Sequence, residues 1–191
     1  DMSGLSLKNV TLSLIDTAKN KPVYREQGEM LFTHFGVSGP LVLSASAYVK
    51  KSTYRIEIDL KPALDDKKLD ARLLRDFSEQ HTKQISTVMR GLLPQAMVEP
   101  VLDKAGVAVD TRISEITKVQ RAAIVNALKH FDLTVTGLRP IEEAIITDGG
   151  VSLKEIDPKT MGSKLIDGLY FAGEIIDCAA YTGGYNLQIA F

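Results

Sequence analysis

Polar and apolar residues alternate along much of the first sixty positions, in the pattern of strands that bury one face. Residues 10–14 read VTLSL, and this period of two predicts a strand. A polar turn over 16–21 lets residues 22–27 return as its hairpin partner, and residues 29–33 predict another strand. Apolar residues also alternate with charged ones over 54–60, so this part of the chain is predicted to be mainly β.

The spacing of apolar residues changes to that of helices between positions 62 and 130. Three apolar stripes with intervals of three and four residues lie within 69–105. Pro100 falls inside the last stripe and is expected to kink or split that helix. Thr117 and Gln120 have the spacing of a capping box ahead of a further helix. These patterns predict a helical bundle inserted between β segments.

Strand character resumes after the helical stretch. Alternation over 131–137 predicts one strand, and the apolar residues 144–146 predict another. The sequence DGG at 148–150 is typical of a tight turn. Residues 169–172 (LYFA) predict a short buried strand, followed after a Gly pair by a helix over 185–191. The chain is therefore predicted to be an α+β protein.

The predicted elements group into three regions. A β-rich, barrel-like domain is expected over 1–61 and 131–166, with the helical bundle of 62–130 inserted into it. Residues 167–191 would form a strand and a helix that belong to another domain. The chain begins without a leader and ends inside an apolar periodic pattern, which suggests a piece of a larger protein.

Composition narrows the classes of function. Of 191 residues, 45% are hydrophobic and 25% are charged, as in an ordinary globular protein. The formal net charge is −1, and Lys and Arg are spread along the chain, so no nucleic-acid partner is expected. No stretch spans a bilayer and no signal peptide is visible, so we expect no membrane partner and a cytoplasmic protein. The single cysteine, Cys178, excludes a Cys-rich metal site, and no ligand spacing predicts a metal.

Glycine is concentrated near the C-terminus, where half of the 14 glycines lie between positions 149 and 184. Gly173 and Glu174 follow the predicted buried strand, at the end where open α/β sheets bind ligands. Gly183 and Gly184 open the last helix, whose positive end favours negative charge. A Gly-rich turn that only joins a strand to a helix would have the same spacing, so the residues alone leave both interpretations open.

Three segments of the chain are distinctive: GEMLFTHFGVSGPLVLSASAY (28–48), ITDGGVSLKEIDPKTMGSKLIDGLYFAGE (146–174) and GLYFAGEIIDCAAYTGGYNLQIAF (168–191). They resemble bacterial FAD-dependent oxidoreductases of the aminoacetone-oxidase-like (YhiN-type) family. Their order and spacing match as well, so the resemblance covers essentially the whole chain. It implies a Rossmann-type FAD domain interrupted by a β-rich domain with a helical insert. The C-terminal strand and helix would then be a returning piece of that FAD domain.

The resemblance also implies FAD as the cofactor and a set of residues that contact it. These residues are Gly173, Glu174, Gly183, Gly184, Tyr185 and Asn186. Glu174 would accept hydrogen bonds from the ribityl hydroxyls. The amides that follow the Gly pair would face the pyrimidine edge, where the helix dipole would stabilise charge on the reduced ring. The family's N-terminal glycine fingerprint is missing, so this chain alone is expected to bind FAD weakly or not at all.

Three residues are candidates for the chemistry itself. Asp177 and Tyr181 would flank the same part of the flavin. His34, inside LFTHFGVSGP, could exchange a proton on the substrate side, although a lone His beside aromatic residues is more often structural. Ser38–Pro40 marks a helix start that could bind an anion and is more often a simple cap.

The leading hypothesis is the substrate-side and insert region of a FAD-dependent oxidoreductase. The parent protein would transfer hydride or electrons to a small-molecule substrate, with NAD(P)H as a potential reductant, and the fragment alone would be inactive. The alternative is a non-catalytic interaction module of a β-barrel and a helical bundle. The glycine density argues against this alternative, because an interaction surface gains little from it.

Overall fold

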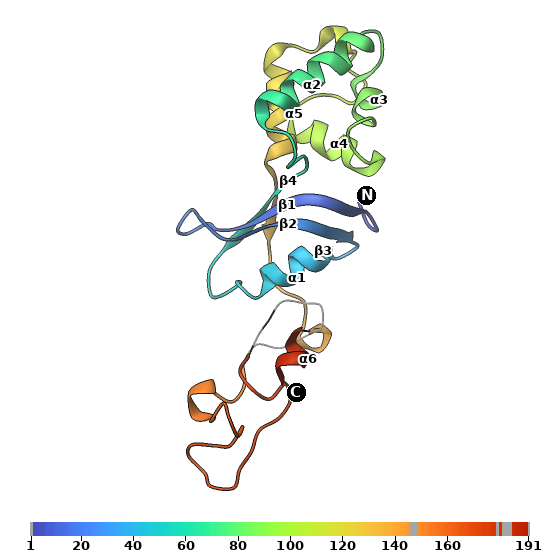
Figure 1. The fold of residues 1–191 in the computed structure, drawn as a ribbon. Helices are drawn as coiled ribbons and strands as arrows, with labels where there is room; N and C mark the ends of the chain where they lie inside the picture. The colour runs from blue at the N-terminus through green and yellow to red at the C-terminus, as the bar shows by residue number, and fades with distance from the viewer. Residues whose placement is uncertain (1, 146–148, 179, 181–184, 191) are drawn as a thin grey trace. The chain divides into compact units, whose positions relative to one another are not determined.

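The computed structural model describes residues 2–145, 149–178, 180 and 185–190. The chain divides into two compact units, Asp1–Thr136 and Gly137–Phe191, and each is considered by itself (Figure 1). The first unit contains a sheet and a helical region. The second is built largely from turns and short helical segments.

Five described strands of the first unit form one antiparallel sheet in the order β3-β2-β1-β4-β5. They are β1 (Ser6–Asp16), β2 (Lys21–Thr33), β3 (Gly36–Ser38), β4 (Tyr54–Asp59) and β5 (Phe131–Val135). The predicted hairpin is confirmed, but residues 22–27 and 29–33 belong to one long strand rather than two. Because β3 and β5 are both edges, the barrel-like domain expected from the sequence is an open half-barrel.

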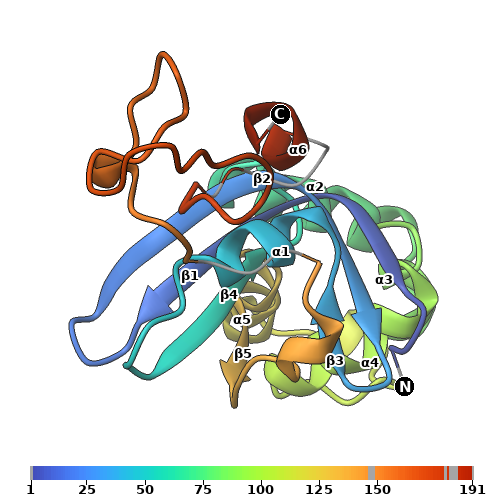
Figure 2. The same ribbon diagram turned by 90° about the horizontal axis from the view of Figure 1, so that it is seen from below.

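One face of this sheet is apolar, as the alternation predicts. It buries side chains such as Leu12 and Met30, which are at most 1% exposed. Helix α1 (Pro40–Ser46) begins at the predicted proline and lies across this face (Figure 2), with Leu41 packed over Gly28 of β2. The opposite face carries the polar residues of the alternating strands.

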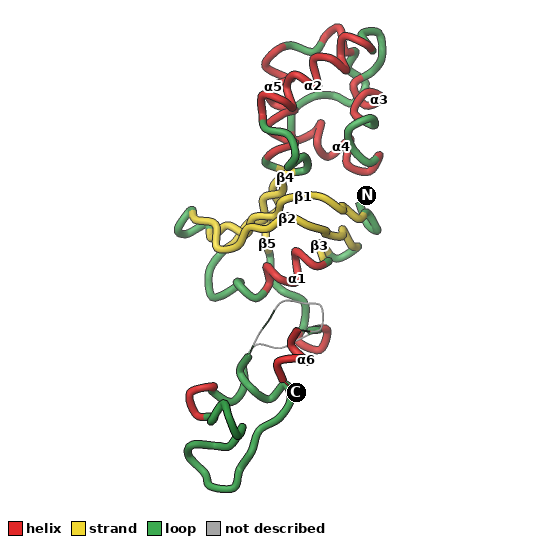
Figure 3. Tube along the Cα trace, in the orientation of Figure 1, coloured by secondary structure: helices red, strands yellow, loops and turns green. Residues whose placement is uncertain are grey.

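The predicted helical region follows β4 and precedes β5 along the chain, and its helices gather on one side of the sheet (Figure 3). Its elements are α2 (Asp66–Glu79), α3 (Ile85–Met89), α4 (Gln95–Lys104), the short 3₁₀ helix η1 (Ile113–Glu115) and α5 (Lys118–Lys129). The capping box is confirmed, since the Gln120 amide donates to Thr117 Oγ1 at 3.2 Å. Pro100 does not split α4, because Met97 and Val101 on either side of it are fully buried and hold the helix together.

The sheet and the helical region share one continuous apolar core. Its fully buried members come from both parts of the unit and include Leu12, Ile58, Leu69, Met97 and Leu128. The helical region is therefore packed as part of the first unit rather than attached by a free linker. Among the described helices, none is long and apolar enough to cross a membrane.

The second unit has less regular structure than the sequence patterns predict. Its described helices are η2 (Ile141–Glu143), η3 (Leu153–Glu155) and α6 (Tyr185–Ala190). The strand predicted at 144–146 is wrong for Ala144 and Ile145, which form no strand, and Ile146 lies outside the described residues.

The short buried strand predicted over 169–172 is also wrong. Tyr170 is 68% exposed and forms only an isolated bridge, with Gly162. A strand needs neighbouring strands to satisfy its backbone groups. Here the Phe171 amide donates to the Met161 carbonyl at 2.9 Å instead. The apolar run is therefore held in a local loop pairing.

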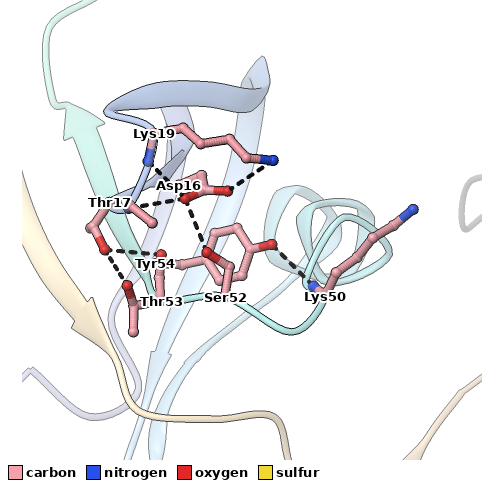
Figure 4. A network of polar contacts seen from close by, with 8 residues as sticks. Asp16, Thr17, Lys19, Lys50, Ser52, Thr53 and Tyr54 are labelled. Atoms are coloured by element: carbon pink, nitrogen blue, oxygen red, sulfur yellow. Dashed lines mark hydrogen bonds and ion pairs between the residues drawn. The ribbon is translucent and has the colours of Figure 1, made fainter.

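Asp16, at the end of β1, organises a polar network at one end of the sheet (Figure 4). Its Oδ1 accepts hydrogen bonds from the amides of Ala18 (3.0 Å) and Lys19 (3.2 Å) and from the Ser52 hydroxyl (3.0 Å). Burial alone would raise the pKa of Asp16, but these hydrogen bonds and the Lys19 charge lower it overall. The network ties the β1–β2 turn to the segment that precedes β4.

Replacing Asp16 with alanine is expected to lower the melting temperature by several degrees at neutral pH. Because the pKa of Asp16 is lower in the folded state, its carboxylate stabilises the fold above the unfolded-state pKa. This contribution is lost as the pH falls through the folded-state pKa. Thermal melts of the wild type and Asp16→Ala should therefore differ at neutral pH and converge below about pH 4. An equal difference at every pH would contradict this role.

Candidate functional site

Two glycine-containing segments that are far apart in the sequence lie side by side in the second unit. Val151 forms a parallel bridge with Ile176. The Val151 amide donates to the Ile175 carbonyl at 2.8 Å, and the Val151 carbonyl accepts from the Asp177 amide at 3.0 Å. Residues 149–151 are thereby held against the segment that follows Gly173.

Gly150 makes this close approach possible. Its φ is +148°, and a Cβ at this position would collide with the Ile175 carbonyl oxygen and lie 2.9 Å from the Asp177 nitrogen. Gly173 also has a positive φ, +87°, and its carbonyl accepts from the Ile176 amide at 3.3 Å. Only glycine adopts such backbone without strain. The close backbone approach that the glycine density predicts is thus partly an approach of the chain to itself.

The two predicted acids of this segment are accessible. The residues Glu174 and Asp177 are exposed, whereas Gly173 is buried. Among the described residues neither acid forms an ion pair. Both carboxylates can therefore accept hydrogen bonds from the hydroxyl or amide groups of a ligand.

Asn186, at the start of α6, holds the neighbouring segment in place. Its Oδ1 accepts from the Ala180 amide at 2.7 Å, and its Nδ2 donates to the Ala180 carbonyl at 2.9 Å. Its side chain is thus used within the chain, so its contact to a cofactor would be made by the backbone. Tyr185 is 59% exposed. The predicted residues Tyr181, Gly183 and Gly184 lie outside the described residues.

His34 belongs to the first unit, in the turn between β2 and β3. The side chain is exposed and packs edge-on against Phe35, with ring centroids 5.0 Å apart. The following helix start has a structural explanation, because Gly39 has φ +93° and a Cβ there would lie 3.0 Å from Met30 Cα. Helix α1 has 7 residues, too few for an anion site at its N-terminus. Nothing in this geometry assigns His34 a partner in catalysis.

Sequence reasoning missed a polar pocket on the outer face of the sheet. The strand register places Ser13 of β1 between Arg25 of β2 and Glu57 of β4, with Thr11 next along the same face. With residues at the foot of the helical region, these side chains enclose a pocket of about 290 Å³. The only sequence signal for this pocket was the set of polar residues that alternate with the apolar ones along each strand. Such residues are equally typical of a sheet face that only contacts water.

Lys129, the last residue of α5, fixes the foot of the helical region to the sheet. Its Nζ lies 2.6 Å from Asp59 Oδ2 on β4, and the two side chains are only 12% and 16% exposed. The same ammonium group donates to the carbonyls of Lys61 (3.3 Å) and Leu64 (2.7 Å), in the β4–α2 connection. We call this arrangement the Lys129 clamp.

Most charges around the clamp are compensated. His130 Nδ1 lies 3.2 Å from Glu57 Oε1. The amide of Lys68 donates to Asp65 at the start of α2 and lowers the pKa of that carboxyl, against the opposing effect of burial. In the part of the chain that the structure describes, no three His, Cys, Asp or Glu side chains converge to hold a metal ion.

Comparison with known proteins identifies relatives along the whole chain. The model of the HI0933-like protein barrel and H2TH domain matches residues 1–146. The ribosomal RNA dihydrouridine synthase of Haemophilus influenzae is 35% identical over 190 residues, which are 100% of this chain and 44% of that protein. The enzyme of the same name from Escherichia coli is 31% identical over 185 residues, 97% of this chain and 44% of that protein.

A third relative is named for a different activity. The 3-dehydro-bile acid delta(4,6)-reductase of Clostridium scindens is 26% identical over 171 residues, 87% of this chain and 42% of that protein. The chain thus spans less than half the length of the curated relatives it matches.

These relatives correct one expectation from the sequence. We expected no nucleic-acid partner, and this exclusion is wrong, since two relatives are named for action on ribosomal RNA. The exclusion relied on the net charge of −1. That argument holds only if this chain supplies all the phosphate contacts of its protein, and it spans 44% of each of those relatives.

Proposed function

This chain belongs to the HI0933-like family, and we propose that it is part of a flavin-dependent reductase that acts on uridine in ribosomal RNA. The observation that carries the proposal is the 35% identity to a ribosomal RNA dihydrouridine synthase along the full chain. The family resemblance found in the sequence is confirmed by the match to residues 1–146. In this proposal residues 1–61 and 131–166 form the substrate-side domain, 62–130 its helical insert and 167–191 the returning piece of the flavin domain.

The names of the relatives describe related chemistry. Dihydrouridine arises from uridine when a hydride and a proton add across the carbon–carbon double bond of uracil, which is conjugated to a ring carbonyl. A 3-dehydro bile acid with delta(4,6) unsaturation is likewise a ketone conjugated to double bonds. Such double bonds accept hydride because the carbonyl stabilises the resulting negative charge. We infer that reduction of a conjugated double bond is the reaction type and that uridine is the substrate.

We propose that the C-terminal residues of the chain contact the flavin. Bound there, the flavin would supply the hydride. Glu174 would accept hydrogen bonds from the ribityl hydroxyls, and its exposed carboxylate, which forms no ion pair with the residues that the structure describes, supports this role. Gly173, next to Glu174, has a positive φ and carries no side chain that would hinder a close ligand. The amides of Gly183, Gly184, Tyr185 and Asn186 remain the proposed contacts to the pyrimidine edge.

The second step of the reduction needs a proton donor. A proton must reach the carbon next to the carbonyl, and a side chain that titrates or hydrogen-bonds at the ring can deliver it. The candidates in this chain are His34, Asp177 and Tyr181. The test variants of the full-length protein are His34→Gln, Asp177→Asn and Tyr181→Phe. The variant that removes the proton donor should reduce the substrate about a hundredfold more slowly and still bind flavin. If all three variants reduced the substrate at the wild-type rate, none of the three residues would be the proton donor.

The proposal is tested on the full-length protein. Purified, it should be yellow from bound FAD, lose that colour when NADH or NADPH is added, and regain it with a uridine-containing ribosomal RNA fragment. Recovery of colour with a conjugated steroid ketone but not with RNA would favour the activity of the Clostridium scindens relative. A colourless protein that takes up no added FAD would support the non-catalytic interaction module instead.

A further inference from the structure

The polar pocket on the outer sheet face contains groups that the fold does not use. Its floor is the row Arg25–Ser13–Glu57 across three strands, with Thr11 beside it. Its wall on the helical side includes Asp66, in the first turn of α2. At about 290 Å³, the pocket is at the lower end of the sizes of small-molecule sites.

Several of the lining side chains are already engaged. Lys129 is neutralised by Asp59 in the Lys129 clamp, and Glu57 lies between His130 and Arg55, whose NH2 group is 3.8 Å from Glu57 Oε2. In this wall the Lys129 and Arg55 cations are paired with the Asp59 and Glu57 carboxylates. They have little charge left to attract or repel a ligand.

Other lining groups have no partner among the described residues. The Ser13 side chain belongs to a residue only 7% exposed, yet its hydroxyl forms no hydrogen bond within the described part of the chain. The Ser13 oxygen is not among the fully buried side-chain atoms that lack a partner, so it is accessible and can exchange a water for a hydrogen bond to a ligand. The Arg25 guanidinium and the Asp66 carboxylate also form no ion pair in the described ranges. The pocket therefore offers a cation, hydroxyls and an acceptor.

We propose that this pocket binds one nucleotide of the RNA substrate, apart from the uridine that is reduced. Arg25 would hold the phosphate, since a guanidinium pairs well with phosphate oxygens. The hydroxyls of Ser13 and Thr11 would bond the ribose or the base, as in recognition of unstacked RNA bases. Asp66 would accept from an exocyclic amino group, which favours adenine over uracil. The inference rests on the proposed action on RNA and assigns a second contact point for that substrate.

The test is binding of AMP and UMP to the full-length protein by isothermal titration calorimetry, followed by binding of the RNA. AMP should bind more tightly than UMP. Arg25→Gln should weaken AMP binding about tenfold, and Ser13→Ala about threefold, as expected for a charged and a neutral hydrogen bond. In Arg25→Gln the slope of the logarithm of the RNA-binding constant against the logarithm of the salt concentration should also fall by about one, because one phosphate contact is lost.

Arg90→Gln is the matched control, because Arg90 is an exposed arginine of the helical region that does not line the pocket. It should leave AMP binding unchanged. Absence of AMP binding, or equal AMP affinity in Arg25→Gln and Arg90→Gln, would overturn the inference. Binding of a zwitterionic amino acid in place of AMP would overturn it as well. If dihydrouridine still forms in those cases, the proposed function stands and only the second contact is lost.

Discussion

Replacing Gly150 with alanine is expected to abolish flavin retention by the full-length protein, the largest effect we expect from a single change. The added Cβ would collide with the Ile175 carbonyl and approach Asp177 N to 2.9 Å, and both contacts are backbone atoms that cannot move alone. The φ of +148° adds about 1–3 kcal/mol of strain for a residue with a side chain. The segment from Gly173 to Asp177 must therefore shift.

This shift would displace Glu174, the proposed ligand of the ribityl hydroxyls. The measurement is the flavin-to-protein ratio of purified Gly150→Ala, read from the visible spectrum. Gly137→Ala is the matched control, because a Cβ at Gly137 meets nothing within 4 Å and its φ is not in the left-handed region. Gly137→Ala should retain flavin. Full flavin content in Gly150→Ala would show that the pairing of 149–151 with 173–177 does not matter for the cofactor.

Replacing Lys129 with methionine is expected to destabilise the first unit by about 3 kcal/mol, as found when one partner of a buried ion pair is removed. The change leaves Asp59 at 16% exposure without its cation and removes the donor to the carbonyls of Lys61 and Leu64. Because the clamp joins α5 to β4, the helical region should also become more mobile against the sheet. Urea unfolding measures the stability, and amide exchange in 60–66 and 128–131 measures the mobility.

Lys118→Met serves as the control for this prediction. Lys118 is an exposed residue at the other end of the same helix and forms no ion pair among the described residues. Its replacement should change stability by less than about 0.5 kcal/mol. The double variant Lys129→Met with Asp59→Leu should recover part of the loss, since an apolar pair removes the unpaired carboxylate. A loss of equal size in Lys118→Met would contradict the clamp.

The first unit could be predicted from the sequence in most of its elements. Alternation identified β1, β2 and β4, because each buries one face against the core. Pro40 marked the start of α1, and Thr117 with Gln120 marked the start of α5. These signals depend only on residues that are close in the sequence, so the rest of the fold does not override them. Of the two effects expected of Pro100, a kink or a split, the split does not occur, because burial of the residues around it outweighs one missing hydrogen bond.

The second unit was harder to predict because many of its described apolar residues are exposed. Residues 169–172 have the composition of a buried strand, yet Leu169 and Tyr170 are 39% and 68% exposed. An apolar composition shows only that a segment can be buried. No strand among the described residues pairs with 169–172 to bury it. The glycines were informative for a different reason. Their concentration predicted close backbone approaches, and Gly150 and Gly173 have a positive φ, which glycine adopts without strain.

The polar pocket and the Lys129 clamp could not be found from sequence patterns. Ser13, Arg25 and Glu57 are neighbours only through the register of three strands. Lys129 and Asp59 are far apart in the chain and meet because α5 returns to the end of β4. The error about nucleic acid has a similar origin, since a net charge describes a whole chain and not the surface that contacts the substrate.

The most direct test of the central claim is the mass of ribosomal RNA from cells with and without the intact gene for the full-length protein. Nuclease fragments from wild-type cells should contain a uridine that is heavier by two hydrogen atoms, and the same fragment from deletion cells should lack this increase. Restoring the wild-type gene should restore the mass, and the Gly150→Ala variant should not. Identical fragment masses in wild-type and deletion cells would contradict the account.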